Sequence, residues 1–161
     1  MNEQSWQDKI KKGRYVERQV LRWIKKTYDK DAFIPGGYLP EYDIDSKAMG
    51  NIEIKEDRIA HHTDNYAIEF ENGNGKPSGI EITTAKFFII VDYEYLILIP
   101  TESLKFVVNN CQNKKIIDMG DRFASGKCSK GWLIPRNVLL TTPFAQVTKR
   151  WFPVFKEKYG R

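Results

Sequence analysis

The sequence contains little that is typical of a secreted or membrane-bound protein. Only two cysteines occur in 161 residues, and Cys111 and Cys128 match no spacing of a metal or redox site. No apolar run is long enough to span a bilayer, and the N-terminus is too polar for a secretory signal. We therefore expect a cytoplasmic protein that has no membrane partner and keeps its thiols reduced.

The composition is that of an ordinary globular protein. Hydrophobic residues make up 41% of the chain and charged residues 29%. No low-complexity segment and no long Pro/Gly linker divides the sequence. We expect one domain over residues 1–161, which is long enough to bury a sizeable core.

Charge is distributed unevenly along the chain, whose net charge is +5. Residues 1–30 hold nine Lys/Arg against four Asp/Glu, and residues 101–161 hold twelve against four. Residues 41–81 reverse this balance, with ten acids against four bases. One interpretation is solvated surface charge. The other is a metal-binding carboxylate cluster within a surface that attracts polyanions, because neutralising phosphates releases counterions.

Hydrophobic periodicity predicts helices near both ends and strands between them. Residues 5–28 should form a helix with an apolar stripe, whose opposite side carries basic residues. Residues 42–45 and 51–55 alternate in polarity around a turn and predict a β-hairpin. The remaining predicted elements are strands at 66–71, 87–91 and 95–99, strands ending at Pro100 and Pro135 with a helix start after each, and a basic aromatic helix at 146–159.

The candidate catalytic residues lie in the predicted hairpin. Alternate side chains of a strand share a face, so Glu53 and Lys55 should point together, away from Ile52 and Ile54. A tight hairpin can bring Asp43 near Glu53. Two carboxylates then offer oxygen ligands for a hard cation such as Mg²⁺ or Mn²⁺, and the lysine can orient water or offset charge on a phosphate. The alternative is an exposed pair of cross-strand ions on an ordinary sheet.

An aspartate followed ten residues later by Glu-x-Lys, as in Asp43, Glu53 and Lys55, resembles the motif of PD-(D/E)XK nucleases. Pro40 does not directly precede the aspartate, as the motif would have it. The resemblance covers roughly residues 10–105 and includes phage-encoded endonucleases and Holliday-junction resolvases. It implies an α/β fold with a restriction-endonuclease-like core, in which helices flank a central mixed β-sheet.

The resemblance also implies further site residues. In resolvases an N-terminal helix supplies an additional glutamate, and residues 13–17 are similar to the start of that helix, which makes Glu17 a candidate. Residues 67–71 and 75–80 are similar to phage-encoded members, which makes Glu69 another. We expect Asp43, Glu53 and either Glu17 or Glu69 to hold the metal. Each could instead be a surface residue.

The expected partner is DNA. Arg14, Arg18 and Arg22 share one face of the first helix and could contact phosphates, as could Lys76 and Ser78 in a turn-rich segment. That segment lacks the glycine and hydroxyl spacing of a nucleotide-binding loop, so no nucleotide cofactor is expected. His61 and His62 are adjacent and poorly placed to chelate one ion, and we expect them in a loop.

The sequence therefore predicts a Mg²⁺-dependent endodeoxyribonuclease. The resemblance implies a homodimer and is compatible with a phage-encoded enzyme of the host cytoplasm that acts on branched DNA. The sequence leaves open whether the substrate is duplex, branched or single-stranded. The alternatives are a noncatalytic nucleic-acid-binding module with the same fold and a protein-interaction domain whose carboxylates lie only on its surface. A cleavage assay separates the first two, and DNA binding separates both from the third.

Overall fold

The computed structural model describes residues 3–36, 42–122 and 126–149. The helices are α1 (Glu3–Thr27), α2 (Ala60–Thr63), α3 (Thr101–Asn110), α4 (Arg136–Thr141) and the 3₁₀ turn η1 (Gly79–Glu81). The strands are β1 (Ile52–Glu56), β2 (Asn65–Glu71), β3 (Phe87–Val91), β4 (Tyr95–Pro100), β5 (Lys115–Arg122), β6 (Cys128–Pro135) and β7 (Gln146–Lys149).

The strands form two sheets. The first has the order β1-β3-β4-β7, with β1 parallel to β3 and the other pairs antiparallel, so it is a mixed sheet. The second is antiparallel, with the order β2-β6-β5. The predicted α/β class with a mixed sheet and helices is confirmed. A separate second sheet was not expected, because strand pairing over long sequence distances leaves no local signal.

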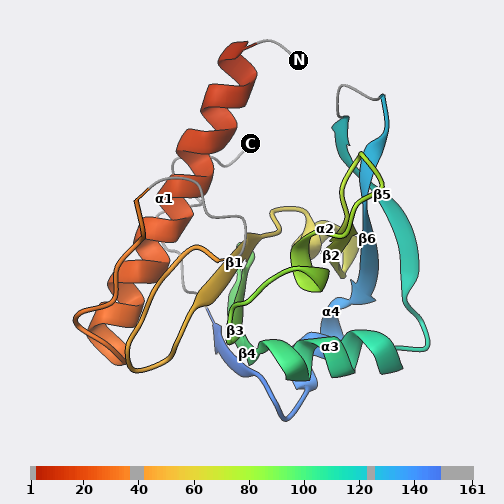
Figure 1. Cartoon of the computed structure of the whole chain (residues 1–161). Helices are drawn as coiled ribbons and strands as arrows, with labels where there is room; N and C mark the ends of the chain where they lie inside the picture. Colours follow the sequence, from red (N-terminus) through yellow and green to blue (C-terminus); the bar gives the residue numbers. More distant parts are fainter. Residues whose placement is uncertain (1–2, 37–41, 123–125, 150–161) are drawn as a thin grey trace.

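Helix α1 covers one face of the mixed sheet (Figure 1). Its apolar stripe packs through Val16, Val20 and Ile24, which are all buried. These side chains meet Ile52 and Ile54 of β1, together with alternate residues of β3 and β4. Because β1 turns its isoleucines toward α1, its Glu53 and Lys55 face the opposite side of the sheet.

The opposite face of the mixed sheet packs against the rest of the molecule. Phe88 and Ile90 of β3 form a second cluster with Tyr66 and Ile68 of β2 and with Leu104 of α3. Helices α3 and α4 lie on this side, and the β5–β6 ribbon extends away from them (Figure 1). The mixed sheet is therefore the middle layer, with α1 on one side and the second sheet and short helices on the other.

The predicted hairpin is present as a single bridge. Ile44 and Ile52 pair antiparallel, with backbone N–H groups donating in both directions at 3.0 and 2.8 Å. The strands at residues 66–71, 87–91 and 95–99 are confirmed by β2, β3 and β4. The helices after Pro100 and Pro135 are confirmed by α3 and α4.

The predicted helix at residues 146–159 is wrong in its first turn. Residues 146–149 form β7, which pairs with the edge of β4 that β3 leaves free, with Val147 opposite Ile97. Tertiary pairing thus overrides a helical pattern, and residues 150–159 lie outside the described part. The expectation that His61 and His62 lie in a loop is also wrong, since both belong to the one-turn helix α2. Within the described residues, no helix is both long and apolar enough to cross a bilayer.

Candidate active site

The centre of the candidate site is strand β1, at the edge of the mixed sheet. Glu53 is almost fully buried, with 5% of its surface exposed, while the side chain of Lys55 remains 40% exposed. The ammonium of Lys55 lies 2.6 Å from Oε1 of Glu53. The predicted common face of these two residues therefore exists, and the lysine is its more exposed member.

Asp43 reaches the site from the bridge beside β1. The backbone N–H of Ile54 donates to Oδ2 of Asp43 at 2.7 Å, and that of Asp43 donates to the carbonyl of Ile52 at 2.9 Å. Because Ile54 lies between Glu53 and Lys55 in the sequence, this bond fixes the Asp43 carboxylate close to both. The structure thus brings together the three residues of the motif.

Glu17 and Glu69 approach the same place from two other elements. Glu17 lies on α1 and interacts electrostatically with Glu53 and with Asp43. Glu69 lies on β2 of the second sheet and interacts with Glu53 and with Lys55. Carboxylates from three segments therefore act on the Lys55 ammonium, and Glu17 acts on two of these acids.

Burial and mutual repulsion raise the pKa of three acids in this cluster. Burial is the largest cause of the raised pKa of Glu53, and Asp43 and Glu69 raise it further, against the opposing effect of Lys55. Burial likewise raises the pKa of Asp43 and that of Glu17. For Lys55, burial lowers the pKa, but the neighbouring carboxylates outweigh it and hold that pKa above its ordinary value. One ammonium is thus insufficient to compensate these acids.

The donor set suits a hard divalent cation. All four acidic side chains offer carboxylate oxygens, which Mg²⁺ and Mn²⁺ prefer, and the uncompensated negative charge favours a cation. Among the described residues, however, no three His, Cys, Asp or Glu side chains are close enough to hold an ion as they stand. Their oxygens are engaged with Lys55, with the Ile54 amide and with Ser78. Each of these contacts engages one oxygen of a carboxylate, so a cation would bind once the side chains move closer together.

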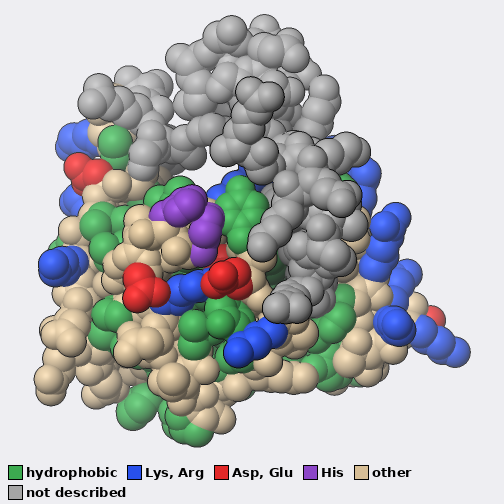
Figure 2. All heavy atoms as spheres, turned by 180° about the vertical axis from the view of Figure 1, so that it is seen from behind, with side chains coloured by type: hydrophobic (Ala, Val, Ile, Leu, Met, Phe, Trp, Pro, Cys, Tyr) green, Lys and Arg blue, Asp and Glu red, His purple; other side chains and the backbone are tan. Residues whose placement is uncertain are grey.

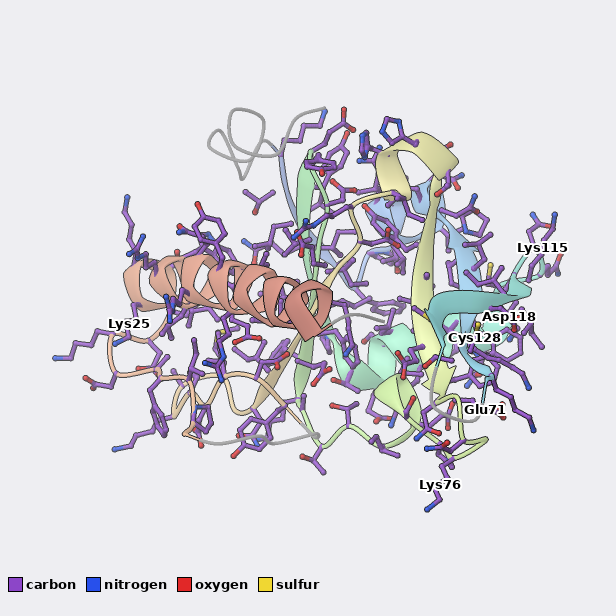
Figure 3. All side chains as sticks on the ribbon, turned by 90° about the horizontal axis from the view of Figure 1, so that it is seen from above. Lys25, Glu71, Lys76, Lys115, Asp118 and Cys128 are labelled. Carbon is purple, nitrogen blue, oxygen red and sulfur yellow. The ribbon has the colours of Figure 1, made fainter. Side chains whose placement is uncertain are left out.

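The predicted phosphate contacts lie on different parts of the surface. Arg14, Arg18 and Arg22 are exposed along α1, and the first two lie beside Glu17, where they lower its pKa against the effect of burial. Lys76 is exposed and points away from the body in Figure 3. Ser78 is buried, and its hydroxyl donates to Oε1 of Glu69. Ser78 thus lies next to the site, and its contact with DNA stays a prediction.

Charge on the surface is mixed rather than uniformly basic. Figure 2 shows a face on which acidic and basic side chains lie beside the histidines of α2. On this helix the centroids of the two imidazole rings lie 3.7 Å apart with the rings tilted by 40°, and His61 also contacts Tyr93 edge-on. Nδ1 of His61 is buried without a hydrogen-bond partner in the part of the chain described.

Two positioning contacts were not predicted from the sequence. Asp29, just after α1, accepts a hydrogen bond from Ser46 at 2.7 Å and one from the Ala48 amide at 3.1 Å. This joins the helix that carries Glu17 to the turn between Asp43 and Glu53. The second contact is that of Ser78 with Glu69. Both bridge segments that are separated in sequence, so no local pattern reveals them.

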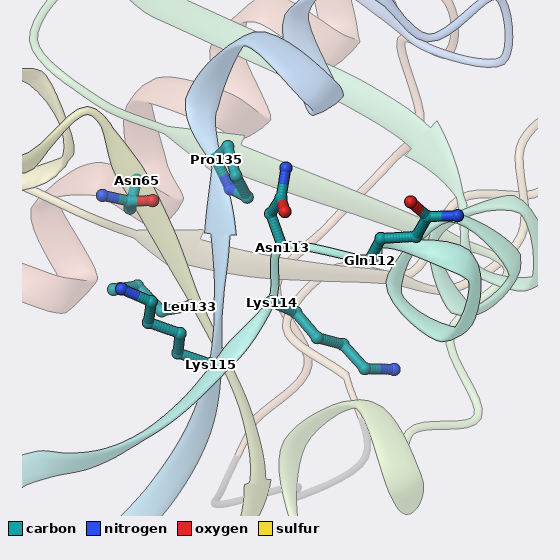
Figure 4. Close-up of a pocket in the computed structure, with 7 residues that line it drawn as sticks. All are labelled: Asn65, Gln112, Asn113, Lys114, Lys115, Leu133 and Pro135. Carbon is teal, nitrogen blue, oxygen red and sulfur yellow. The ribbon is translucent and has the colours of Figure 1, made fainter.

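A separate pocket lies on the second sheet. It has a volume of about 480 Å³ and is lined mainly by polar residues, among them Asn65, Gln112 and Lys115 (Figure 4). Lys114, which also lines the pocket, donates to the carbonyl oxygen of Val108 at 2.9 Å. Its ammonium group is thus bound near the end of α3. None of the predicted site residues lines this pocket.

Comparison with family models, with curated proteins and with solved structures finds no match for this chain. The interpretation of the site therefore depends on its own geometry and on the motif in the sequence.

Proposed function

We propose that the chain is a Mg²⁺-dependent endodeoxyribonuclease built on a restriction-endonuclease-like core. The observation that carries this proposal is the position of Lys55, whose ammonium lies among the carboxylates of Glu53, Asp43 and Glu69. A surface ion pair needs one carboxylate. A lysine beside several partly buried carboxylates matches the requirements of metal-assisted phosphodiester hydrolysis.

The acids and the lysine of the site have different roles. Asp43 and Glu53 hold the cation, and Glu17 or Glu69 completes its ligands. The bound cation supplies Lewis-acid polarisation of the phosphate and lowers the pKa of a water molecule. Lys55 orients the attacking water and offsets the negative charge that develops on the phosphate. The Lys55 side chain as a whole is 40% exposed, so the substrate would approach along it.

The arginines of α1 supply the contact with the DNA backbone. Arg14 and Arg18 lie beside Glu17, so a strand that follows this face of the helix passes the carboxylate cluster. Positive charge at this point also offsets the repulsion between phosphates and the site's acids. Branched DNA and a homodimer remain our proposals for the substrate and the assembly.

A cleavage assay tests the function. The purified chain is incubated with linear duplex, single-stranded, flap and four-way-junction DNA in Mg²⁺, in Ca²⁺ and in EDTA. We expect cutting in Mg²⁺, none in EDTA, and binding with little cutting in Ca²⁺, whose coordination is looser. Binding without cutting in Mg²⁺ or Mn²⁺ would favour the noncatalytic module instead. Neither binding nor cutting would contradict both.

A further inference from the structure

Ser78 lies beside the candidate site without belonging to the motif. Its hydroxyl donates to Oε1 of Glu69, and only 8% of its surface is exposed. We infer that Ser78 is a positioning residue, which orients the Glu69 carboxylate and thereby sets the affinity of the site for a divalent cation. This inference rests on the function proposed above.

The backbone brings Ser78 to Glu69 through a tight turn after β2. Within this turn, the Asn72 amide donates to the carbonyl of Lys76 at 2.9 Å. The Ser78 amide then donates to the carbonyl of Phe70 at 3.0 Å. The chain thus doubles back along β2, so that residue 78 is held against residues 69 and 70 by main-chain bonds.

Gly79 makes this close approach possible. Its φ is +54°, a conformation that residues with a side chain rarely adopt. A Cβ atom at this position would collide with the backbone carbonyl oxygen of Glu69. The glycine therefore allows the segment to lie directly on the strand, which places the preceding serine beside the Glu69 side chain.

Strand β2 is irregular at the same point. Its pairing with β6 shifts register between Glu69 and Glu71, where Glu69 lies opposite Gly131 and Glu71 opposite Lys130. Bulges of this kind redirect side chains and are frequent beside active sites. Bulge and turn together fix the direction of Glu69, whose charge acts on Glu53 and Lys55 of the mixed sheet.

The chemistry of this contact suits a metal ligand. Ser78 donates to one carboxylate oxygen and leaves the other for a cation. The hydroxyl carries no charge, so it does not compete with the cation as a lysine would. A carboxylate that is oriented beforehand loses less rotational freedom on binding. Removing such a partner typically lowers metal affinity about 10- to 100-fold.

A double-mutant cycle tests the inference, with Mn²⁺ affinity measured by calorimetry on the full chain. Ser78→Ala should weaken Mn²⁺ binding about 10- to 100-fold. In the Glu69→Ala background, the same substitution should have no further effect, because its target is gone. Ser78→Thr keeps the hydroxyl and should restore most of the affinity. Thr141→Ala removes an exposed hydroxyl at the end of α4 and should leave affinity unchanged.

The outcomes separate the inference from the function on which it rests. If wild type binds Mn²⁺ and cleaves DNA but Ser78→Ala binds equally well, the inference fails and the function stands. An equal loss from Ser78→Ala with and without Glu69 would show a structural effect on the turn, and would also overturn the inference. Wild type that neither binds Mn²⁺ nor cleaves DNA would contradict the proposed function itself.

Discussion

The acidic residues of the candidate site oppose folding at neutral pH. Glu17, Asp43 and Glu53 all have a raised pKa, with burial as the largest cause, which means that the fold disfavours their ionised forms. An acid with a raised pKa lowers the free energy of unfolding at pH values above that pKa, where its ionised form is buried in the folded protein. The proposed function therefore needs an arrangement that lowers stability until a cation binds.

Asp43→Asn should accordingly stabilise the protein in EDTA. Asparagine keeps an oxygen for the Ile54 amide but cannot ionise. Because the pKa of Asp43 is raised in the folded state, we expect a higher Tm than wild type at pH 7. The gain should shrink as the pH falls and disappear below about 4, where the unfolded carboxyl also becomes protonated. Thermal denaturation over this range measures it.

Magnesium should reverse the order of stability. A ligand that binds only the folded state raises Tm by mass action, so Mg²⁺ should raise that of wild type and have little effect on Asp43→Asn. A lower Tm for Asp43→Asn in EDTA at neutral pH would show that the Asp43 carboxylate stabilises the metal-free fold, contrary to this account.

At the scale of elements, the site depends on how α1 and the bridge beside β1 are joined. Asp29 accepts hydrogen bonds from Ser46 and from the amides of Asp31 and Ala48. The hydrogen bond from Ser46 is the largest cause that lowers the pKa of Asp29 to about 2. The contact holds the turn between Asp43 and Glu53 against the end of the helix that carries Glu17.

Asp29→Ala should therefore destabilise the protein and reduce cleavage. The pKa of Asp29 is lower in the folded state, so its contribution is complete above about pH 4 and is lost as the pH falls through about 2. Urea unfolding at several pH values should show the difference from wild type shrinking below about pH 4. Asp31→Ala is the control, since its backbone amide is retained. A difference independent of pH would argue against the contact.

These elements also show which structural features can be predicted from the sequence. The period of two in residues 52–55 predicts which face of β1 carries Glu53 and Lys55, because alternation is local. Helix α1 and the starts of α3 and α4 are likewise encoded by periodicity and by proline. Strand β7 is not encoded locally, because residues 146–149 become a strand only by pairing with the free edge of β4. The contact between Ser78 and Glu69 depends on the path of a turn that composition alone does not define.

At the scale of the whole molecule, a buried ionic network joins the two sheets. Arg136 follows β6, and its guanidinium donates to Oδ2 of Asp92 at 2.7 Å, in the turn between β3 and β4. Tyr66 of β2 donates to the same oxygen at 2.6 Å. Since Glu53 and Glu69 belong to different sheets, this network helps to fix the separation of the carboxylates.

Arg136→Ala should be strongly destabilising. It leaves the Asp92 carboxylate buried without its cation, and breaking such a pair costs about 3–5 kcal/mol. Lys105→Ala removes an exposed pair with Glu102 and should cost less than about 1 kcal/mol. Denaturant unfolding of the two variants tests this difference. Similar losses would mean that Arg136 is not the stabilising connection between the sheets.

The charge of the whole chain leads to a prediction about DNA binding. Affinity should fall steeply with salt, because counterion release dominates sequence-independent binding. Neutralising Arg18 and Arg22 together should reduce the slope of log affinity against log salt by about two, if both contact phosphates. Lys105→Gln serves as a control away from α1. An unchanged slope in the double variant would place this helix face away from DNA.

The most direct test of the account compares metal binding and cleavage in site variants. If Glu53 is a ligand and Lys55 acts on water or phosphate, Glu53→Ala and Lys55→Ala should both lose cleavage for different reasons. Glu53→Ala should bind Mn²⁺ much more weakly. Lys55→Ala loses the ammonium that lies 2.6 Å from Glu53 and should bind Mn²⁺ at least as well as wild type.

Calorimetric Mn²⁺ titration beside a Mg²⁺ cleavage assay, on wild type and both variants, makes this measurement. The account predicts Mg²⁺-dependent cleavage by wild type alone, with Mn²⁺ binding retained in Lys55→Ala and weakened in Glu53→Ala. Full cleavage by either variant would contradict the proposed active site, and wild-type Mn²⁺ affinity in Glu53→Ala would contradict the assignment of its ligands.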